Sequence, residues 1–395
     1  MLVLLLAPPI IARAEDPRLA EIRSALQHIR EEGPRHQESR GASPELTTVK
    51  HELRDWVESH LVQLGSDPND TNTGEESFLA GQLNAELRTA HLLCPAEDQC
   101  VNNTNTWLGY LGPIRLQFRQ RESYLIVVTS FGVGCGFDES AYLYVRDHDH
   151  WNRIWESEQN IYTKKGYTPQ NIHAVLVSPS AKEGTPLVMT LGTQPWCSSS
   201  WRDNYVRVWK VSSESKLLLD QTRWAWAYGL HDIPMEGSIG PEDALIELTV
   251  GSFDPGIHHY EEIWHYRIQG DKLERIDPVA LNPRDFTEEW LAQPWTQSAL
   301  WSQPSSRTSL QGVHDDDNGG EFAPTLHCRQ RPDLWQVGID RSSQKKGSVY
   351  FLVRWRPPYH FTMVRALNGP AADCTEKDPG ADDPATLFPI QDWRD

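Results

Sequence analysis

The hydrophobic positions of the first hundred residues follow a helical period. The clearest apolar stripe recurs every three or four residues, at Leu46, Val49, Leu53, Val57, Leu61 and Leu64, and predicts an amphipathic helix. A helix before it is predicted to begin after Asp16, a suitable N-cap that Pro17 follows. A third is predicted over about 79–90. Lys50, Asp55 and Glu58 lie off the stripe of the second helix, so we expect them in solvent. Residues 15–105 are predicted to be a helical segment that caps or docks onto the rest.

From about residue 107 the period changes to two, which is typical of strands. The segment IRLQF alternates apolar and polar residues, and the stretch from Tyr124 to Asp277 then repeats one unit three times. Thr129, Thr190 and Thr249 occupy the same place in the three copies, so the repeat is about 60 residues long. Strands before each copy (IRLQF, IHAVLVSP and RWAWAYG) would give four strands per unit. Residues 106–277 are therefore predicted to form three β units.

The pattern is interrupted over 278–325 and resumes in 326–395. Asp285 and Glu288 resemble a capping box, and Phe286 and Trp290 lie one turn apart on the helix that would follow. We expect that helix to end at 293–295 and an exposed loop, SQPSSRTSLQGVHDDDNGGE, to come after it. Four more apparent strands (LHCRQ, LWQVGID, GSVYFLVRW and YHFTMVRAL) predict a fourth unit, followed by an acidic tail.

These patterns predict a mostly β fold. Four-stranded meanders in series are typical of a propeller-like array, here of about four units after an N-terminal helical segment. The repeat is longer than the roughly 40–50 residues of a compact blade, so long loops must take up the difference. The alternative is a pair of packed antiparallel meander sheets.

The first 14 residues, MLVLLLAPPIIARA, resemble a secretory signal peptide. A short apolar core ends at Ala12-Arg13-Ala14, a small-x-small cleavage pattern. The alternative is a buried apolar strand. No other run of 18 apolar residues occurs, which argues against membrane insertion. We expect an exported protein, secreted or periplasmic.

Charge narrows the classes of partner. The formal net charge of −18 disfavours binding to nucleic acid and to anionic membranes. Such a surface attracts cations, including calcium. The chain also carries 16 Trp, more than its 12 Tyr or 10 Phe, and this excess fits pleated sheets and ligand platforms alike.

Six cysteines in an exported chain predict disulfides. Cys94 and Cys100 would close a small loop. Cys135 and Cys197 follow the first repeated strand of adjacent units and would join neighbours, although Cys135 could instead be a catalytic thiol. The remaining pair, Cys328 with Cys374, would tie the tail to the last unit.

Two segments carry candidate metal ligands. In an extended segment His259, Glu261 and His265 share one face, and the first two could hold zinc or another transition metal. His265 lies roughly 20 Å from His259 at 3.3 Å per residue, too far for one ion. The competing interpretation is a solvated strand face opposite an aromatic core face.

The acidic stretch HDDDNGGE is the candidate calcium site. Asp315 and Asp317 would supply oxygen ligands on a glycine-containing loop, but the spacing is not that of an EF-hand. A solvated acidic loop is the competing interpretation. No cofactor is expected, although this stretch could bind calcium.

The remaining candidate is an aromatic platform. Trp196 and Trp201 flank Cys197 in a polar loop, and tryptophans fixed by a disulfide would form a rigid surface for sugars or peptides. Burial against a neighbouring unit is the alternative.

No catalytic residue can be assigned, because the chain has no G-x-S-x-G elbow and its 55 acids make accidental carboxylate pairs inevitable. We therefore expect a non-catalytic binding protein that presents a glycan or protein ligand surface on its loops. The alternative is an extracellular hydrolase that uses carboxylate or metal chemistry on the same loops. The sequence identifies neither the ligand nor the oligomeric state.

Overall fold

A computed structural model describes most of the chain outside its two ends. The described residues are 16–32, 44–62, 73–94, 108–119, 123–133, 136–148, 150–158, 169–179, 185–194, 201–226, 235–254, 259–276, 280–316, 320–342, 346–356 and 360–377. They divide into two compact units, Met1–Asn171 and Ile172–Asp395. The predicted signal peptide lies outside the described residues.

The first unit begins with the three predicted helices, which are α1 (Pro17–Glu32), α2 (Pro44–Leu61) and α3 (Thr73–Thr89). Asp16 caps α1 as predicted, since its carboxylate accepts a hydrogen bond of 2.9 Å from the Arg18 amide. The leucines, isoleucines and valines of the three helices are buried, including all the described members of the stripe predicted for α2. The helical period therefore located the apolar face of α2 correctly.

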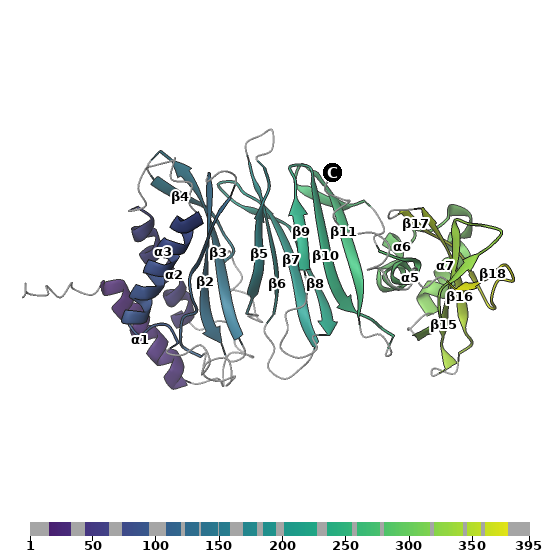
Figure 1. Ribbon diagram of the computed structural model, residues 1–395, viewed down its shortest axis with the longest axis horizontal. Coiled ribbons are helices and arrows are strands. Elements are labelled where there is room, and N and C mark those ends of the chain that lie inside the picture. The colour runs from purple at the N-terminus through teal and green to yellow at the C-terminus, as the bar shows by residue number, and fades with distance from the viewer. Residues whose placement is uncertain are drawn as a thin grey trace, which may run out of the picture. The chain divides into compact units, whose positions relative to one another are not determined.

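The helices pack on a four-stranded antiparallel sheet (Figure 1). Its strands, in spatial order, are β1 (Arg115–Arg119), β2 (Tyr124–Val133), β3 (Gly136–Asp147) and β4 (His150–Glu156). Every residue of β2 is buried. Leu125, Val127 and Tyr142 share one hydrophobic core with the helices, so this sheet is covered on the face toward α2 and α3.

The expectation that Lys50 is solvated is wrong, and Glu58, whose side chain is 35% exposed, also contacts the sheet. Lys50 is 3% exposed, and its Nζ lies 2.5 Å from the buried carboxylate of Asp138 on β3. Glu58 accepts hydrogen bonds from the Tyr144 hydroxyl and the Arg153 guanidinium at 3.1 and 3.0 Å. Helical periodicity identifies the apolar stripe but not the polar residues beside it, which here reach the sheet at the edge of the packed face.

The second unit starts with two further four-stranded antiparallel meanders. The second sheet has the order β5 (Asn171–Val177), β6 (Leu187–Thr193), β7 (Trp201–Lys210), β8 (Lys216–Trp226), and the third has β9 (Met235–Ile239), β10 (Asp243–Gly251), β11 (His259–Gln269), β12 (Lys272–Arg275). RWAW was expected to open the third unit, but Arg223–Trp226 is the end of β8. The long β7–β8 pairing takes up these residues, and β9 supplies the fourth strand instead.

The second and third sheets share one core. Met189 and Val206 pack with Ile246 and Trp264 from the facing sheet. At Gly237 a Cβ atom would come within 2.9 Å of the Met189 Cε, so the two sheets approach each other closely there.

The insertion between the third and fourth sheets is more helical than predicted. Its elements are α5 (Pro283–Ala292), α6 (Trp295–Ser298), a short 3-10 turn η2 (Pro304–Ser306) and α7 (Arg307–Asp316). The stretch expected to be an exposed loop therefore contains α7. The N-cap of α5 is Asn282, not Asp285: the Asn282 side-chain oxygen accepts the Asp285 amide at 2.8 Å. Phe286 and Trp290 lie buried on α5 as predicted.

The last sheet contains the four predicted strands and two more. It has β17 (His360–Leu367), β16 (Val349–Arg356), β15 (Leu334–Asp340), β14 (Leu326–Cys328) and β18 (Cys374–Lys377) in spatial order, and β13 (Glu321–Phe322) also pairs with β15. Aromatic side chains join the sheet to α5: Phe361 stacks on both Phe286 and Trp355, with ring centroids 5.2 and 5.7 Å apart.

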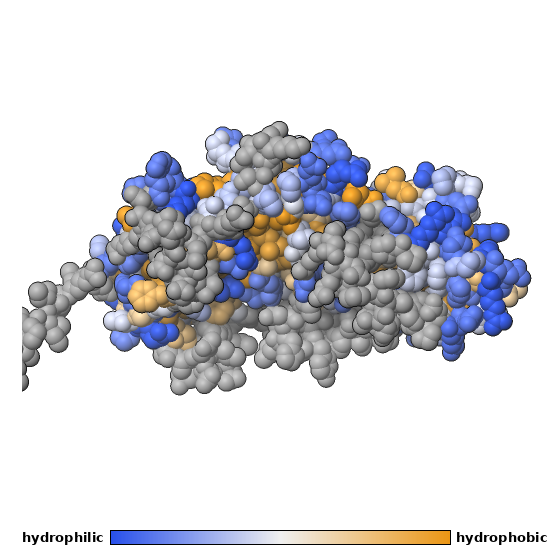
Figure 2. All heavy atoms as spheres, turned by 45° about the horizontal axis from the view of Figure 1, so that its top comes forward, coloured by the Kyte–Doolittle hydropathy of each residue, from blue (hydrophilic) through white to orange (hydrophobic). Residues whose placement is uncertain are grey.

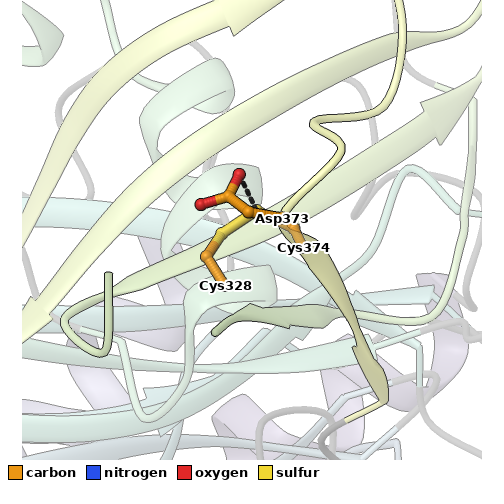
Figure 3. Close-up of side chains that lie close together, drawn as sticks. All are labelled: Cys328, Asp373 and Cys374. Atoms are coloured by element: carbon orange, nitrogen blue, oxygen red, sulfur yellow. Dashed lines mark hydrogen bonds between the residues drawn. A yellow bond between two sulfur atoms is a disulfide. The ribbon is translucent and has the colours of Figure 1, made fainter. Parts of the chain in front are cut away.

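The predicted Cys328–Cys374 disulfide is present and joins β14 to β18 (Figure 3). Asp373 lies beside it and is held by the Arg331 guanidinium at 3.0 and 2.8 Å. Cys94 is also disulfide-bonded. Cys100, Cys135 and Cys197 lie outside the described residues, so the other two predicted pairings stay predictions.

The fold is thus mostly β, a series of antiparallel meander units after an N-terminal helical segment, as predicted. Whether the units form a propeller-like array or packed pairs of sheets, and whether they close into a ring, stays a prediction. On the face that Figure 2 shows, hydrophilic residues cover much of the described surface of the last sheet. Within the described ranges, the helices are too short or too polar to cross a membrane.

Replacing Lys50 should strongly destabilise the first unit. Lys50→Met leaves the Asp138 carboxylate buried without its cation, and such a loss costs about 3–5 kcal/mol of unfolding free energy. Urea unfolding would measure it. Lys216→Met, which removes an exposed ion pair with Asp271, is the matched control and should leave the curve unchanged. Equal effects of the two variants would contradict the structural role of the buried pair.

Candidate functional site

The densest group of ionisable side chains in the described structure lies where β11 meets α5. On β11 the even-numbered residues Tyr260, Glu262, Trp264 and Tyr266 are buried. This face packs toward the second sheet, as alternation along a strand requires. The predicted aromatic core face of this segment is therefore confirmed, but it also carries a carboxylate, Glu262, which is 0% exposed.

Protein donors surround the Glu262 carboxylate. The Tyr260 hydroxyl donates to its Oε1 at 2.7 Å, and the Trp264 indole N–H donates to its Oε2. The Arg223 guanidinium, from β8 of the second sheet, lies 3.8 Å from Oε2 and is 30% exposed. Glu262 is therefore held by both sheets.

A second carboxyl group, Glu289, enters from α5. It is also 0% exposed, and the Gln293 side chain donates to its Oε1 at 2.9 Å. Arg275 of β12 lies 2.7 Å from the same oxygen. The Arg275 guanidinium is enclosed between the Trp264 and Trp301 rings, 5.7 and 5.2 Å from their centroids, which favours its charge.

Glu262 and Glu289 share one proton. Burial and the Glu262 charge raise the pKa of Glu289 well above its usual range, and Arg275 only partly opposes them. The pKa of Glu262 is lowered: burial opposes ionisation, but the hydrogen bond with Glu289 and the charges of Arg223 and Arg275 outweigh it. Glu289 is thus the protonated member and Glu262 the ionised one.

Two more carboxyl groups of α5 are buried beside this pair. Glu288 accepts from the Phe253 amide at 2.6 Å and the Ser252 hydroxyl at 3.0 Å, while burial raises its pKa to about 8. Asp285 accepts from Arg284 and Asn282, and burial raises its pKa as well. The Glu288 bonds fix α5 to the chain segment that follows β10.

Two carboxyl groups with opposite pKa shifts are what an acid–base pair needs. Here, however, both groups are enclosed and their oxygens already accept protein hydrogen bonds. A substrate atom could reach them only by displacing Tyr260, Trp264 or Arg275. The arrangement therefore has acid–base character without substrate access in the described structure.

An open cleft of about 620 Å³ lies at the opposite end of the third sheet. It is formed by the turn between β9 and β10, by the end of β11 and by the residue after β12. Its lining combines hydrogen-bond donors, acceptors and aliphatic groups: Pro241, Glu242, Asp243, His265, Arg267, Ile268, Gln269 and Ile276. A cleft with this mixture could take a small polar ligand.

The structure describes only some of the residues singled out from the sequence. Glu261 accepts a hydrogen bond from Thr249 at 2.9 Å, and burial raises its pKa, so its surroundings are drier than the expected solvated face. The side chain of His259 and all of Asp317 lie outside the described residues. Asp315 lies in the last turn of α7, with a 59% exposed side chain, rather than in a loop. Both metal sites stay predictions.

One group of potential metal ligands is found among the described residues, and it is the Cys328, Asp373 and Cys374 cluster. Its two sulfur atoms are bonded to each other, so they are not thiolates. The tryptophan platform stays a prediction too: Trp196 and the side chain of Trp201 lie outside the described residues.

The sequence reasoning missed Glu262, Glu289 and Arg275. One signal was available in DFTEEW, where Asp285, Glu288 and Glu289 surround the two aromatic anchors of α5. A helix with acids beside its apolar residues and no separate polar face is buried all round or paired with cations.

Comparisons with known proteins identify no family. No family model matches the chain, and no curated protein matches it. Among solved structures it is similar to one described as Bacteroides ovatus Xyloglucan PUL GH43B, at 11% identity and a TM-score of 0.18. The match covers 68% of this chain and 46% of that one, less than half its length. A likeness of this size carries no argument for fold or activity.

Arg275→Met should destabilise the second unit by about 3–5 kcal/mol, because it leaves Glu262 and Glu289 buried without their shared cation. Chemical unfolding followed by tryptophan fluorescence would measure the loss. Arg267→Met, an exposed arginine on the neighbouring strand, should change stability little. A loss below about 1 kcal/mol for Arg275→Met would mean that the carboxyl pair does not need this guanidinium.

Proposed function

We propose that this protein is an exported, non-catalytic binding protein whose ligand is a glycan. The observation that carries the proposal is a contrast between two places in the third sheet. The paired carboxyl groups that could do hydrolytic chemistry are enclosed, whereas the cleft lined by His265 and Arg267 is open. An open polar cleft can admit a ligand, whereas an enclosed carboxyl pair contributes to the packing of the elements around it.

The lining of the cleft supports a saccharide rather than an apolar ligand. Asp243 and Glu242 offer acceptors, Arg267 offers donors and Gln269 offers both, which matches the hydroxyl groups of a sugar. Ile268 and Ile276 add aliphatic surface for the apolar side of the ring. A protein ligand, which the meander loops could also bind, is the other outcome of the test below.

The Cys328–Cys374 disulfide supports export. Structural disulfides persist in oxidising compartments such as the periplasm or the extracellular space. The signal-peptide pattern ending at Ala14 points the same way.

A hydrolase is the second candidate. The opposite pKa shifts of Glu262 and Glu289 favour it, because a protonated and an ionised carboxyl side by side are the groups of acid–base hydrolysis. Turnover of a glycan that is lost in Glu262→Gln, in a variant that still folds, would favour this candidate over binding alone.

Arg267→Ala and His265→Ala should each weaken glycan binding about 10-fold or more, since each removes a hydrogen-bonding group from the cleft, worth about 1.4 kcal/mol. A glycan array would identify the ligand and calorimetry would measure affinity. Lys272→Ala, exposed on β12 and outside the cleft, is the matched control. Unchanged affinity in both cleft variants, or binding to proteins alone, would contradict the assignment.

The tryptophan platform has its own test. If Trp196 and Trp201 stack on the ligand, Trp196→Ala and Trp201→Ala should each reduce affinity, by about 1 kcal/mol or more per lost ring. If both variants bind every detected ligand as the parent protein does, the platform is wrong and the cleft acts alone.

A further inference from the structure

Helix α5 buries three carboxyl groups within ten residues. Asp285, Glu288 and Glu289 are each at most 1% exposed, and the neighbouring Phe286 and Trp290 of the same helix are fully buried. A buried acid must be neutral, ion-paired or well hydrogen-bonded, because removing its charge from water is unfavourable. The surroundings of α5 therefore decide how many protons these groups keep.

Acids outnumber cations around α5. Five carboxyl groups meet there, those of Glu261, Glu262, Asp285, Glu288 and Glu289. The guanidinium groups that face them are Arg223, Arg275 and Arg284. With these five acids and three guanidinium groups ionised, this dry region would hold two uncompensated negative charges, and the buried Asp254 next to Ser252 would add a third. Two retained protons remove the excess among the five acids.

The hydrogen bonds indicate where those protons lie. Glu289 and Glu262 are joined by a side-chain hydrogen bond, which requires a proton on one of them, and Glu289 carries it. Glu288 is buried and paired with no guanidinium in the described structure, and burial raises its pKa although the Ser252 hydroxyl and the Phe253 amide donate to it, so it is the second group to stay protonated.

We propose that the contact of α5 with β11 and with residues 252–254 is a proton-dependent latch. It is closed while two carboxyl groups of this cluster keep their protons, and it opens when they ionise. Opening separates α5 from the third sheet because the hydration of the two excess charges is then more favourable than the packing of the interface.

Other titratable or charged groups also face the cluster and contribute to its charge balance. They are Tyr260 from β11, Asp254 from the segment after β10, and His314 from α7, whose ring meets Trp290 edge-on with centroids 5.0 Å apart. Tyr260 stays neutral because burial and the neighbouring glutamates raise its pKa. Asp254 is occupied by the Phe322 amide, which donates to it at 2.7 Å.

The direction of the pH effect follows from these shifts. A carboxyl group whose pKa is raised by folding stabilises the folded state most below its unfolded pKa of about 4.5, and this contribution disappears as the pH rises through the folded pKa. For Glu288 that value is about 8. The latch is therefore closed in acid and opens on the alkaline side of neutrality.

The latch would also control the chain segment next to it. Glu288 holds both Ser252 and the Phe253 amide, and Phe253 stacks on Phe322 of β13 with ring centroids 5.2 Å apart. Release of Glu288 would thus free the exit from β10 together with α5. Ionisation of Glu288 would therefore loosen both the segment after β10 and the contact of the third sheet with α5.

The experiment compares the full chain with Glu288→Gln/Glu289→Gln, whose amides mimic the protonated acids. Hydrogen exchange of the α5 amides, corrected for the intrinsic pH dependence, should accelerate in the parent protein between pH 6 and 9 and stay flat in the variant. Glu274→Gln, an exposed acid on β12, should behave like the parent. Flat exchange in the parent protein, or the same acceleration in the double variant, would overturn the latch.

A proton count tests the same idea without relying on the double variant to fold. Unfolding the parent protein at pH 7 should release about two protons from this cluster. In each of the single variants Glu288→Gln and Glu289→Gln, the number of protons released should be lower by about one. Titration of an unbuffered solution during denaturant unfolding measures this. Equal release from the parent and both single variants would overturn the proposal.

Discussion

The second unit depends on one charge arrangement, the Glu262–Glu289 pair that shares a proton beside Arg275. Strand alternation places Glu262 in a core of aromatic rings, where no polar residue would be stable alone. Arg223 approaches it from the second sheet, Arg275 from β12 and Glu289 from α5. Hydrophobic packing is not directional, so it does not by itself position these elements. They are positioned by the need to pair each buried charge with an opposite charge or a hydrogen-bond partner.

In the first unit, a buried ion pair joins a helix to the sheet. Lys50 and Asp138 meet between α2 and β3, and Asp138 also accepts the Gln170 amide. In both units a helix is attached to a sheet through an ionisable group that lies just beside its apolar stripe. Such contacts add little net stability relative to a hydrophobic pair, but they penalise every other arrangement of the same elements.

Elements with a sustained period could be predicted from the sequence. The helices before residue 90 follow from a period of 3.6, and the strands follow from a period of two. The strand order within each meander follows because consecutive strands pair with each other. Predictions that depended on a boundary or a partner failed. RWAW has strand character and joined β8 rather than opening the next unit, and Asn282 instead of Asp285 capped α5. The acidic cluster was missed because a buried acid and a solvated acid look alike in sequence. They differ only in the cations that the tertiary fold brings near, such as Arg275.

The disulfide between Cys328 and Cys374 has a consequence for the end of the last sheet. Strand β18 is four residues long, and it covers the outer edge of β14. A strand this short would leave easily, and an uncovered edge presents free amide and carbonyl groups to any other extended chain. The covalent bond joins β18 to the strand it covers, across 46 residues of sequence. A thiol reductant would therefore do more than loosen a tail: if β18 then left the sheet, the backbone groups of β14 that it now pairs with would become open to another extended chain.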